Sequence, residues 1–381
     1  MLLKEYVGKT MPFTFNGELK NLSYLTRVDP LSGRVCKISE ERAKRGTGIS
    51  TNLEIHPIDN CRFCRLFEST PEKRVKHRCG AVSVPNAYPW EKYDWITIYP
   101  PFGKHKLLLS DLYFDDLERM IDSSYDLAEL CSRDPDVFAF MDFTNWGAFA
   151  GASQQHPHSQ RRSITFVASS LQEQERQRCL QVWERTGRNL FDMLAEEERL
   201  DGRRVIHDDG MFIAASFAPA CSDEVIAFPT HDLAHILQTT PQDRKRIMCN
   251  LLGAFPALFF YQGVTDLNIA IHMALHNEME QARKYFRWHV HIYPRKNRLP
   301  VDQAGAEIGY DTSVIDVMPE RSAESLRRWY RHGPQEEMVA RLSDGSPNHR
   351  LIAQLRHLIT NPPSACVVRP EEMEAEAVGS R

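Results

Sequence analysis

Residues 151–166, GASQQHPHSQRRSITF, carry three side chains with ligand-capable groups at alternate positions: His156, His158 and Gln160. Pro157 keeps this segment from becoming helical, and side chains along an extended segment alternate between its two faces. The three groups are therefore expected to project from the same face. Histidine binds zinc as a neutral imidazole, and it also attacks phosphorus as a nucleophile. The pattern predicts a site where one histidine binds a metal ion and its neighbour performs nucleophilic chemistry.

A CRFC motif supplies half of a metal site. Cys61 and Cys64 have the C-x2-C spacing that lets two thiolates reach one tetrahedral zinc ion. Their spacing does not choose the other two ligands. The candidates are His77 and Cys79 from KHRCG, or His105 from FGKH together with His156.

Composition limits the partners of this site. The chain has 381 residues, 42% of them hydrophobic, and a formal net charge of -4, which favours neither nucleic acid nor a membrane surface. No apolar run approaches the ~18 residues that span a bilayer, and the N-terminus lacks the pattern of a signal peptide. Nine scattered cysteines favour reduced thiols over a disulfide framework. These features predict a cytoplasmic protein that acts on small molecules.

The elements that must position the motifs occur twice in the same order. Strand, proline-rich turn, strand and helix are predicted over residues 80–130 and again over 210–259. The HVH motif of the second half occupies the position that corresponds to HPH in the first half. The first helix is expected to begin near Ser110 or Asp111, and the second after a Thr240 cap ahead of Pro241. The sequence therefore predicts an α+β fold with an internal duplication.

The positions of the motifs and the composition of the last residues divide the chain into three parts. An N-terminal half, 1–200, carries the histidine pair and the CRFC motif, and a C-terminal half, 201–360, carries the HVHIYP block. Between the motif regions, residues 171–200 are predicted to form one polar-faced helix. The remaining residues, 361–381, have the Pro and Glu content of a flexible tail.

Four stretches, in order along the chain, resemble the galactose-1-phosphate uridylyltransferase family, the transferase branch of the histidine triad superfamily. They are DPLSGRVCKISEERAKR, CRFC, FTNWGAFAGASQQHPHSQ and WHVHIYP. The resemblance covers most of residues 25–330. It implies two histidine triad-like halves with mostly antiparallel sheets and flanking helices, in a homodimer.

The resemblance also implies a role for each matching residue. His158 is the nucleophile that becomes nucleotidylated, Gln160 binds the transferred phosphoryl group, and Ser153 and Asn145 line the phosphate cradle. The implied nucleotide contacts are Arg42, Arg45 and Asn86. The implied zinc ligands are Cys61, Cys64, His105 and His156. A second divalent metal, iron or zinc, is implied at His272, His289 and His291, completed by Glu175 or, equally by spacing, by Glu173.

Gln160 predicts the kind of reaction. A histidine triad hydrolase needs a third histidine at this position to protonate a poor leaving group, whereas glutamine donates hydrogen bonds but cannot act as an acid. A leaving group of low pKa, such as a phosphate, needs no proton. We therefore expect ping-pong transfer of a nucleoside monophosphate from a nucleotide sugar to a sugar 1-phosphate or phosphate through His158. A zinc ion with four protein ligands would then be structural.

The sugar-recognition segment departs from the family. Aligned on GYD, the family's lysine position falls on Gly305 and its glutamine position on Val317, while Asp311 stands where glutamate is usual. The acceptor therefore stays open between a sugar 1-phosphate and phosphate. The alternative functions are a nucleoside diphosphate sugar or dinucleotide phosphorylase or hydrolase of the same superfamily, and a catalytically silent nucleotide-binding protein.

Overall fold

The computed structural model describes residues 2–9, 13–15, 18–20, 23–38, 61–65, 74–86, 89, 91–100, 114–154, 156–165, 169–255, 257–258, 264, 266–295 and 304–332. Arg42, Arg45, His105 and the predicted tail 361–381 lie outside these described residues. The start predicted for the first helix, near Ser110, also lies outside them.

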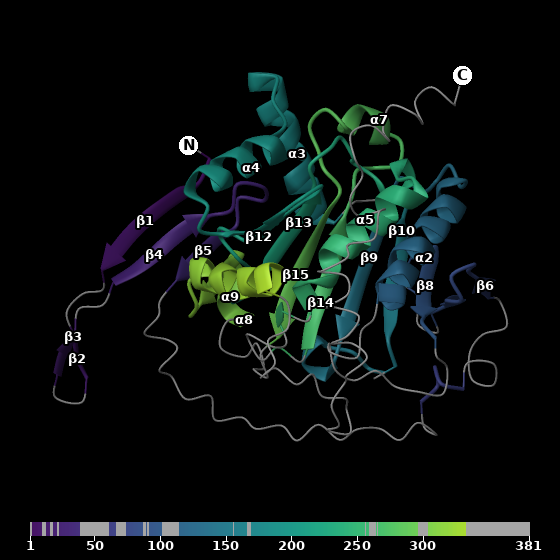
Figure 1. Cartoon of the computed structure of the whole chain (residues 1–381), viewed down its shortest axis with the longest axis horizontal. Helices are drawn as coiled ribbons and strands as arrows, with labels where there is room; N and C mark the ends of the chain where they lie inside the picture. The colour runs from purple at the N-terminus through teal and green to yellow at the C-terminus, as the bar shows by residue number, and fades with distance from the viewer. Residues whose placement is uncertain are drawn as a thin grey trace.

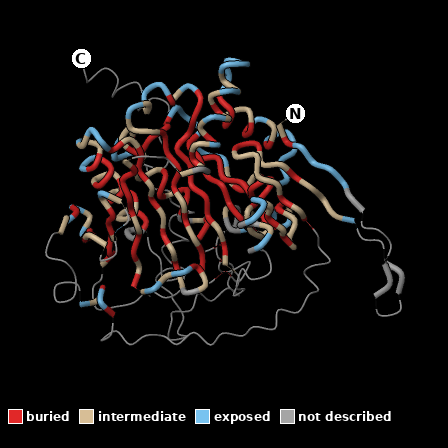
Figure 2. The backbone as a smooth tube through the Cα atoms, turned by 180° about the vertical axis from the view of Figure 1, so that it is seen from behind, coloured by how far each residue is buried: buried red, intermediate tan, exposed pale blue. Residues whose placement is uncertain are grey.

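One large antiparallel sheet forms the centre of the described chain (Figure 1). Its strands, in spatial order, are β11 (Val205–Asp208), β12 (Met211–Ala215), β13 (Val225–Pro229), β15 (His289–Arg295), β14 (Asp266–His272), β9 (Ala139–Trp146), β10 (His158–Ile164), β8 (Tyr93–Ile98), β7 (Val82–Pro85) and β6 (Val75–Lys76). Buried residues are concentrated along these strands (Figure 2). The sheet is therefore the central layer to which the other elements attach.

The predicted duplication is visible in the strand order. Strands β6 to β10 run in the order β6-β7-β8-β10-β9, and strands β11 to β15 repeat it as β11-β12-β13-β15-β14. The two sets meet where β9 pairs with β14, with Asn145 opposite Asn268. Along the chain, each set also has a helix between its third and fourth strands. In the first set this is α2 (Phe114–Ser132), between β8 and β9, and in the second set it is α5 (Pro241–Leu252), between β13 and β14. The α+β fold with two related halves is confirmed.

The two faces of the sheet are covered differently. Helices α2, α5 and α9 (Pro319–His332) pack on one face through a large apolar cluster. On the opposite face, α3 (Ser170–Thr186) and α4 (Leu190–Asp201) cover the second half. A second apolar cluster joins them to the small sheet of β1 (Lys4–Lys9), β4 (Ser23–Val28), β5 (Val35–Ile38) and β16 (Thr312–Ile315). The remaining described elements are β2 (Phe13–Phe15), β3 (Glu18–Lys20), η4 (Ala148–Ala150), η5 (Ile236–Gln238), α7 (Met279–Ala282) and α8 (Ala304–Tyr310).

The prediction of a single helix over 171–200 is wrong. Gly187, at a φ of 67°, ends α3, and the Asn189 side chain caps α4 by accepting a hydrogen bond from Phe191 N at 2.9 Å. A left-handed glycine is a common helix end because it has no Cβ to clash. The second helix is not polar-faced either, since it buries Leu190 and Leu194 against the sheet.

Two other predictions have simple outcomes. α5 begins at Pro241 with Thr240 as its cap, as expected: Thr240 Oγ1 accepts from Asp243 N at 3.1 Å, and the Asp243 carboxylate accepts from Thr240 N at 2.8 Å. Seven described cysteines are free thiols, but Cys249 is disulfide-bonded, so the expectation of reduced thiols is wrong at that position.

Among the described helices, none combines the length and apolar character needed to cross a membrane.

A buried arginine ties α2 to the sheet. Arg161 on β10 donates from Nε to Asp142 on β9 at 3.1 Å, and its other nitrogens reach Ser123 Oγ at 3.1 Å and the Met120 carbonyl at 2.7 Å, both on α2. The side chains of the ion pair are 1% and 2% exposed. A buried charge that loses its partner is strongly destabilising, so this pair determines how firmly the helix is held.

We expect Asp142→Asn to lower the free energy of unfolding by about 3–5 kcal/mol, because it leaves the Arg161 guanidinium buried without a counter-ion. Urea unfolding measures the change. Asp136→Asn is the control, since that carboxylate is 71% exposed and pairs with the exposed Lys92. Its unfolding midpoint should stay at the wild-type value, and equal midpoints for both variants would contradict the proposed importance of the Arg161 ion pair.

Candidate active site and metal clusters

His158, the predicted nucleophile, is the first residue of β10 and is 4% exposed. Its Nδ1 donates to the backbone carbonyl of His156 at 2.8 Å. Burial lowers the pKa of His158, although the hydrogen bond to that carbonyl opposes the shift. The ring is therefore neutral with its proton on Nδ1, which leaves the Nε2 lone pair as the nucleophilic atom.

Cys61, Cys64 and His156 come together as the sequence predicts, with their ligand atoms within 4.8 Å of one another. His156 Nδ1 lies 3.3 Å from Cys64 Sγ. Its Nε2 donates to the Tyr99 carbonyl at 2.7 Å, which fixes the tautomer so that the Nδ1 lone pair faces the thiols. Two thiols and an imidazole oriented by its second nitrogen fit a tetrahedral metal site that lacks one ligand among the described residues.

The alternative ligand pair is excluded. Both ring nitrogens of His77 are engaged, Nδ1 with Asp126 at 2.8 Å and Nε2 with Ser83 at 2.8 Å. Cys79 Sγ contacts the Arg119 carbonyl at 3.8 Å. His77 and Cys79 therefore serve the packing of the strand edge against α2, and neither belongs to the cysteine cluster.

The loop from Cys61 to Cys64 contacts the predicted nucleophile, His158, directly. Phe63, between the two cysteines, packs edge-on against the His158 ring, with 5.0 Å between ring centroids and an interplanar angle of 65°. The loop also folds on itself, since Arg65 N donates to the Cys61 carbonyl at 3.2 Å. A metal ion bound by Cys61 and Cys64 would hold Phe63, and through it the imidazole, in one place.

Gln160 lies on the same face as His158, two residues further along β10. Its Oε1 accepts from Arg162 Nη2 at 2.8 Å. Arg162 Nε in turn donates to Asp94 at 3.0 Å, and Asn86 Nδ2 donates to the other Asp94 oxygen at 3.2 Å. The sequence predicts Asn86 as a nucleotide contact. In the structure, its side chain supports the series of hydrogen bonds from Asp94 through Arg162 to Gln160. The sequence analysis does not identify Arg162 or Asp94 as site residues. Arg162 could have been found, because it continues the alternate positions of His158 and Gln160.

Asn145 and Ser153 flank the turn that leads to the histidines. Asn145 Oδ1 accepts from Asn268 Nδ2 at 2.8 Å, and Ser153 is exposed after the turn. Gly147 begins the turn with a φ of 84°, and an added Cβ there would lie 2.0 Å from Asp266 Oδ1. That same oxygen accepts from Phe149 N at 2.9 Å. The turn of the first half is therefore shaped by a residue of the second half.

A second cluster of ligands lies on the same face, in the second half. Its members are Glu175, His272, His289 and His291, with ligand atoms within 4.8 Å of one another. His272 faces His289 across the β14–β15 pair, and Glu175 reaches them from α3. His272 Nδ1 is 2.7 Å from Glu175 Oε2, and His289 Nε2 is 3.5 Å from the same oxygen.

The protonation and hydrogen bonds of this cluster also fit a cation. Burial disfavours the charged form of Glu175, but its interactions with His272 and His289 outweigh burial and hold its pKa well below the ordinary value. Burial lowers the pKa of His289 to about 4. Within the described chain, Nε2 of His289 and Nε2 of His291 are buried without a hydrogen-bond partner. Their Nδ1 atoms engage the Arg287 carbonyl and Glu224, both at 2.8 Å, so the Nε2 lone pairs are turned into the cluster.

The structure also decides between the two glutamates. Glu173 bonds Arg176 through both carboxylate oxygens, each at 2.8 Å, and its side chain is 40% exposed. Glu175, half a turn further along α3, is 1% exposed and faces the histidines. Only Glu175 belongs to the cluster.

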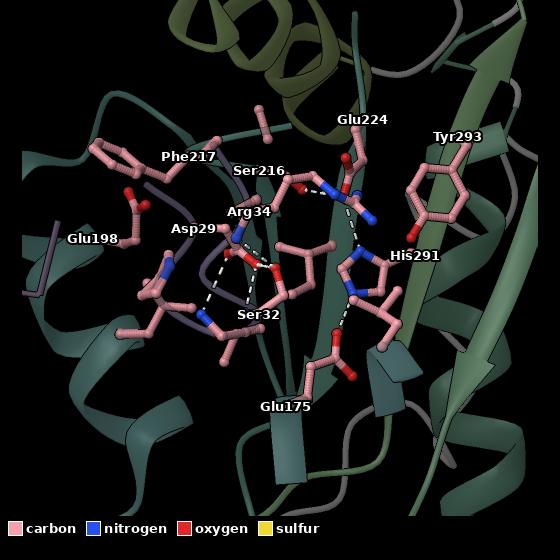
Figure 3. Close-up of a pocket in the computed structure, with 18 of the residues that line it drawn as sticks. Asp29, Ser32, Arg34, Glu175, Glu198, Ser216, Phe217, Glu224, His291 and Tyr293 are labelled. Carbon is pink, nitrogen blue, oxygen red and sulfur yellow. Dashed lines mark hydrogen bonds and ion pairs between the residues drawn. The ribbon is translucent and has the colours of Figure 1, made fainter. Parts of the chain in front are cut away.

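A small pocket opens beside the second cluster, where Glu175, His291 and Tyr293 face the N-terminal Asp29–Arg34 segment (Figure 3). Burial raises the pKa of Asp29, whose carboxylate accepts from Ser32 N at 2.8 Å. Asp311 lies on this side of the molecule, in a left-handed backbone conformation with a φ of 47°. Its carboxylate accepts from Arg34 Nε at 3.1 Å. The structure therefore places Asp311 with the N-terminal segment.

The sheet with its two clusters defines an α+β protein of two related halves, and the solved structures below share this fold. No protein-family model matches the chain. A galactose-1-phosphate uridylyltransferase from Streptomyces lividans is 26% identical over 285 residues, 71% of this chain and 79% of that protein. An ADP-glucose phosphorylase from Arabidopsis thaliana with bound ADP-glucose has the same fold, with a TM-score of 0.66, 21% identity, and coverage of 79% of this chain and 98% of that one.

A further solved structure, of a uridylyltransferase, matches with a TM-score of 0.62 at 19% identity, over 81% of this chain and 99% of that chain. These two structures establish the fold alone. Together with the curated relative, they confirm the resemblance carried by the four sequence stretches. The chain is similar in sequence to a galactose-1-phosphate uridylyltransferase and shares its fold with the two solved structures.

We expect Cys61→Ser to lower the bound zinc by about one equivalent per chain and to reduce thermal stability, because a structural metal contributes folding free energy directly. Metal content is measured by elemental analysis and stability by thermal unfolding. Cys79→Ser is the matched control, since this thiol stands apart from the cluster. Equal metal content in the two variants would place the zinc elsewhere.

The second cluster has its own matched pair of variants. Glu175→Gln should remove one equivalent of bound divalent metal, because it deletes the anionic ligand that compensates the charge of the ion. Glu173→Gln, two residues away on the same helix, should retain that metal. Elemental analysis after dialysis against a weak chelator distinguishes them, and metal loss in both variants would contradict the assignment of Glu175.

Proposed function

We propose that the protein is a nucleotidyltransferase that carries a nucleoside monophosphate from a nucleotide sugar to a phosphate-bearing acceptor through a covalent intermediate on His158. The observation that carries this proposal is the hydrogen bond from His158 Nδ1 to the His156 carbonyl. It commits one ring nitrogen to the backbone and leaves Nε2 as a nucleophile. Similarity to a curated galactose-1-phosphate uridylyltransferase supports the reaction class.

In the first step, the Nε2 lone pair of His158 forms a bond to the α-phosphorus of the nucleotide sugar. The bond between that phosphorus and the bridging oxygen breaks, and the sugar 1-phosphate leaves with the electron pair. No proton moves, because the proton stays on Nδ1. There it remains hydrogen-bonded to the His156 carbonyl, and this bond stabilises the positive charge of the modified ring. In the second step, a phosphate oxygen of the acceptor attacks the same phosphorus and releases Nε2.

Gln160 contributes a hydrogen-bond donor to this reaction. Because Arg162 holds its Oε1 at 2.8 Å, the amide NH2 is the end left for a phosphoryl oxygen. Donors aimed at the non-bridging oxygens stabilise the charge that develops in the transition state. An amide cannot protonate a leaving group, which suits a phosphate leaving group and disfavours transfer to water.

The two clusters are proposed to hold metal ions that support the fold. Zinc suits the two cysteines and His156, with His105 proposed as the fourth ligand, and four protein ligands leave no position for a reacting water. Iron or zinc suits the carboxylate and three histidines of the second cluster. We also propose Arg42 and Arg45 as nucleotide contacts and a homodimer as the functional form.

The acceptor is proposed to be a sugar 1-phosphate or inorganic phosphate, and one observation favours phosphate. Asp311, at the family's glutamate position, is held by Arg34 at 3.1 Å. Gly305 and Val317 replace the other two residues of the sugar-recognition segment. A phosphorylase needs fewer contacts to an acceptor sugar, so it is the second candidate function.

We expect wild-type protein incubated with UDP-, ADP- or GDP-sugars to gain the mass of one nucleoside monophosphate, and His158→Gly to gain none, because the variant lacks the nucleophile. Intact-protein mass spectrometry measures the adduct. His231→Gln is the control, since His231 is an exposed histidine outside the site. Labelling of His158→Gly would contradict the assignment.

The same incubation separates the rival functions. A hydrolase would release free nucleoside monophosphate without an acceptor, and a silent binding protein would bind nucleotide without adduct or isotope exchange. Adding inorganic phosphate or galactose 1-phosphate to labelled protein identifies the acceptor by the rate at which the adduct disappears.

A further inference from the structure

Asn145 lies next to the predicted nucleophile, and the direction of its amide decides whether it can donate to a phosphoryl oxygen. Continuing the β9–β10 register by two residues places Asn145 beside His158. Asn145 Oδ1 accepts from Asn268 Nδ2 at 2.8 Å on the opposite side, from β14. Because the two ends of a carboxamide diverge, the Asn145 NH2 group is turned away from β14. Among the described residues, no hydrogen-bond acceptor contacts that group.

The orientation of Asn268 is determined by an arginine. Arg295 Nε, on β15, donates to Asn268 Oδ1 at 2.7 Å. A guanidinium has no acceptor, so Asn268 must present its oxygen to Arg295. Its Nδ2 then points away and donates to two oxygens, Asn145 Oδ1 and the Ala150 carbonyl, each at 2.8 Å. Reversing the Asn268 amide would set donor against donor at Arg295 and oxygen against oxygen at the other two contacts.

In this series of hydrogen bonds, the orientation of each side chain therefore determines the orientation of the next. Arg295 determines Asn268, and Asn268 determines Asn145, so a residue three strands from β10 sets which end of Asn145 faces the site. A similar arrangement occurs two residues along β10 from His158, where Arg162 holds the oxygen of Gln160. Both amides beside the nucleophile are thus held by their oxygens, with their NH2 groups left to donate.

We propose that Arg295 and Asn268, both from the second half, are positioning residues that direct the Asn145 NH2 group at the transferred phosphoryl group. This inference rests on the proposed nucleotidyl transfer. Donors that already point at a non-bridging oxygen need no reorganisation when its negative charge grows, which is the condition for strong electrostatic stabilisation. Asn268 also holds the Ala150 carbonyl, and with it the turn that leads to Ser153.

Two substitutions of Asn268 separate direction from support. Asn268→Asp keeps the shape and the bond from Arg295 but offers only acceptors. Asn145 must then turn its NH2 group toward the new carboxylate, which presents Oδ1 to the phosphoryl group. Asn268→Ala removes all three hydrogen bonds and leaves the Asn145 amide free to rotate, so it still donates part of the time.

We expect the rate of covalent labelling by the nucleotide sugar to fall about 10-fold in Asn268→Ala and about 100-fold in Asn268→Asp, because misdirected groups beside the reacting centre cost rates of this order. The melting temperatures should run the other way, with Asn268→Asp at or above Asn268→Ala, since the aspartate retains the bond to Arg295. Equilibrium binding of the nucleoside monophosphate should change less than about 3-fold in both variants, as Asn145 is proposed to act on the transferring group. A purely structural role would make activity follow stability.

Variants of Arg295 test the origin of the direction. Arg295→Lys keeps a group that only donates, and labelling should stay within about 3-fold of wild type. Arg295→Gln replaces it with a group that also accepts, so Asn268 can reverse, and labelling should fall by about 10-fold or more. Rescue by lysine and loss with glutamine is the expected signature.

The outcomes distinguish failure of the proposed function from failure of the positioning role. A wild-type protein that gains no label from any nucleotide sugar would overturn the proposed function and this inference with it. A labelled wild type with Asn268→Asp as active as Asn268→Ala, or more active, would overturn the positioning role alone. Equal labelling of the lysine and glutamine variants of Arg295 would likewise contradict the assignment of Arg295 as the residue that sets the direction.

Discussion

The antiparallel pairing of β9 with β14 is the interaction on which the rest of the molecule depends. It joins two five-stranded sets into one sheet, and it removes an exposed edge that each set would otherwise present. Its register places Asn145 opposite Asn268, so β9, the neighbour of the strand that carries His158, contacts the second half through polar side chains. Asp266, at the start of β14, shapes the turn before the histidines. The turn before His158 and the Asn145 side chain therefore both depend on residues of the second half.

The sheet separates support from chemistry because strand side chains alternate between faces. On β10, Arg161 points to the helix-covered face and is buried with Asp142. Its neighbours Gln160 and Arg162 point to the opposite face with His158. Both clusters of candidate metal ligands lie on that second face as well. One face is thus held by apolar packing and a buried ion pair, and the rigid strands present the reactive groups on the other.

The sequence predicts what depends on local spacing. The alternate positions of His156, His158 and Gln160, the CRFC pair, the duplication and the Thr240 cap all follow from residues close together in the chain, and the structure has each of them. Predictions that depend on contacts between distant residues were open or wrong. His77 and Glu173 have suitable types and spacing, but other partners engage them. Asn268 lies 123 positions from Asn145, and only the sheet register brings them together.

Neutral amides held by arginines would suit the proposed reversible transfer between phosphates. A lysine or arginine placed directly on the phosphoryl group would attract every phosphate that enters, including products, by full charge. A carboxamide has a weaker dipole, but it faces either way at similar cost unless a neighbour decides, and arginine decides because it only donates. Arg162 and Arg295 hold Gln160 and, through Asn268, Asn145 by their oxygens. The charges of Arg162 and Arg295 thus lie one and two hydrogen bonds behind the amides, and in the proposed transfer the oriented amide dipoles would face the phosphorus.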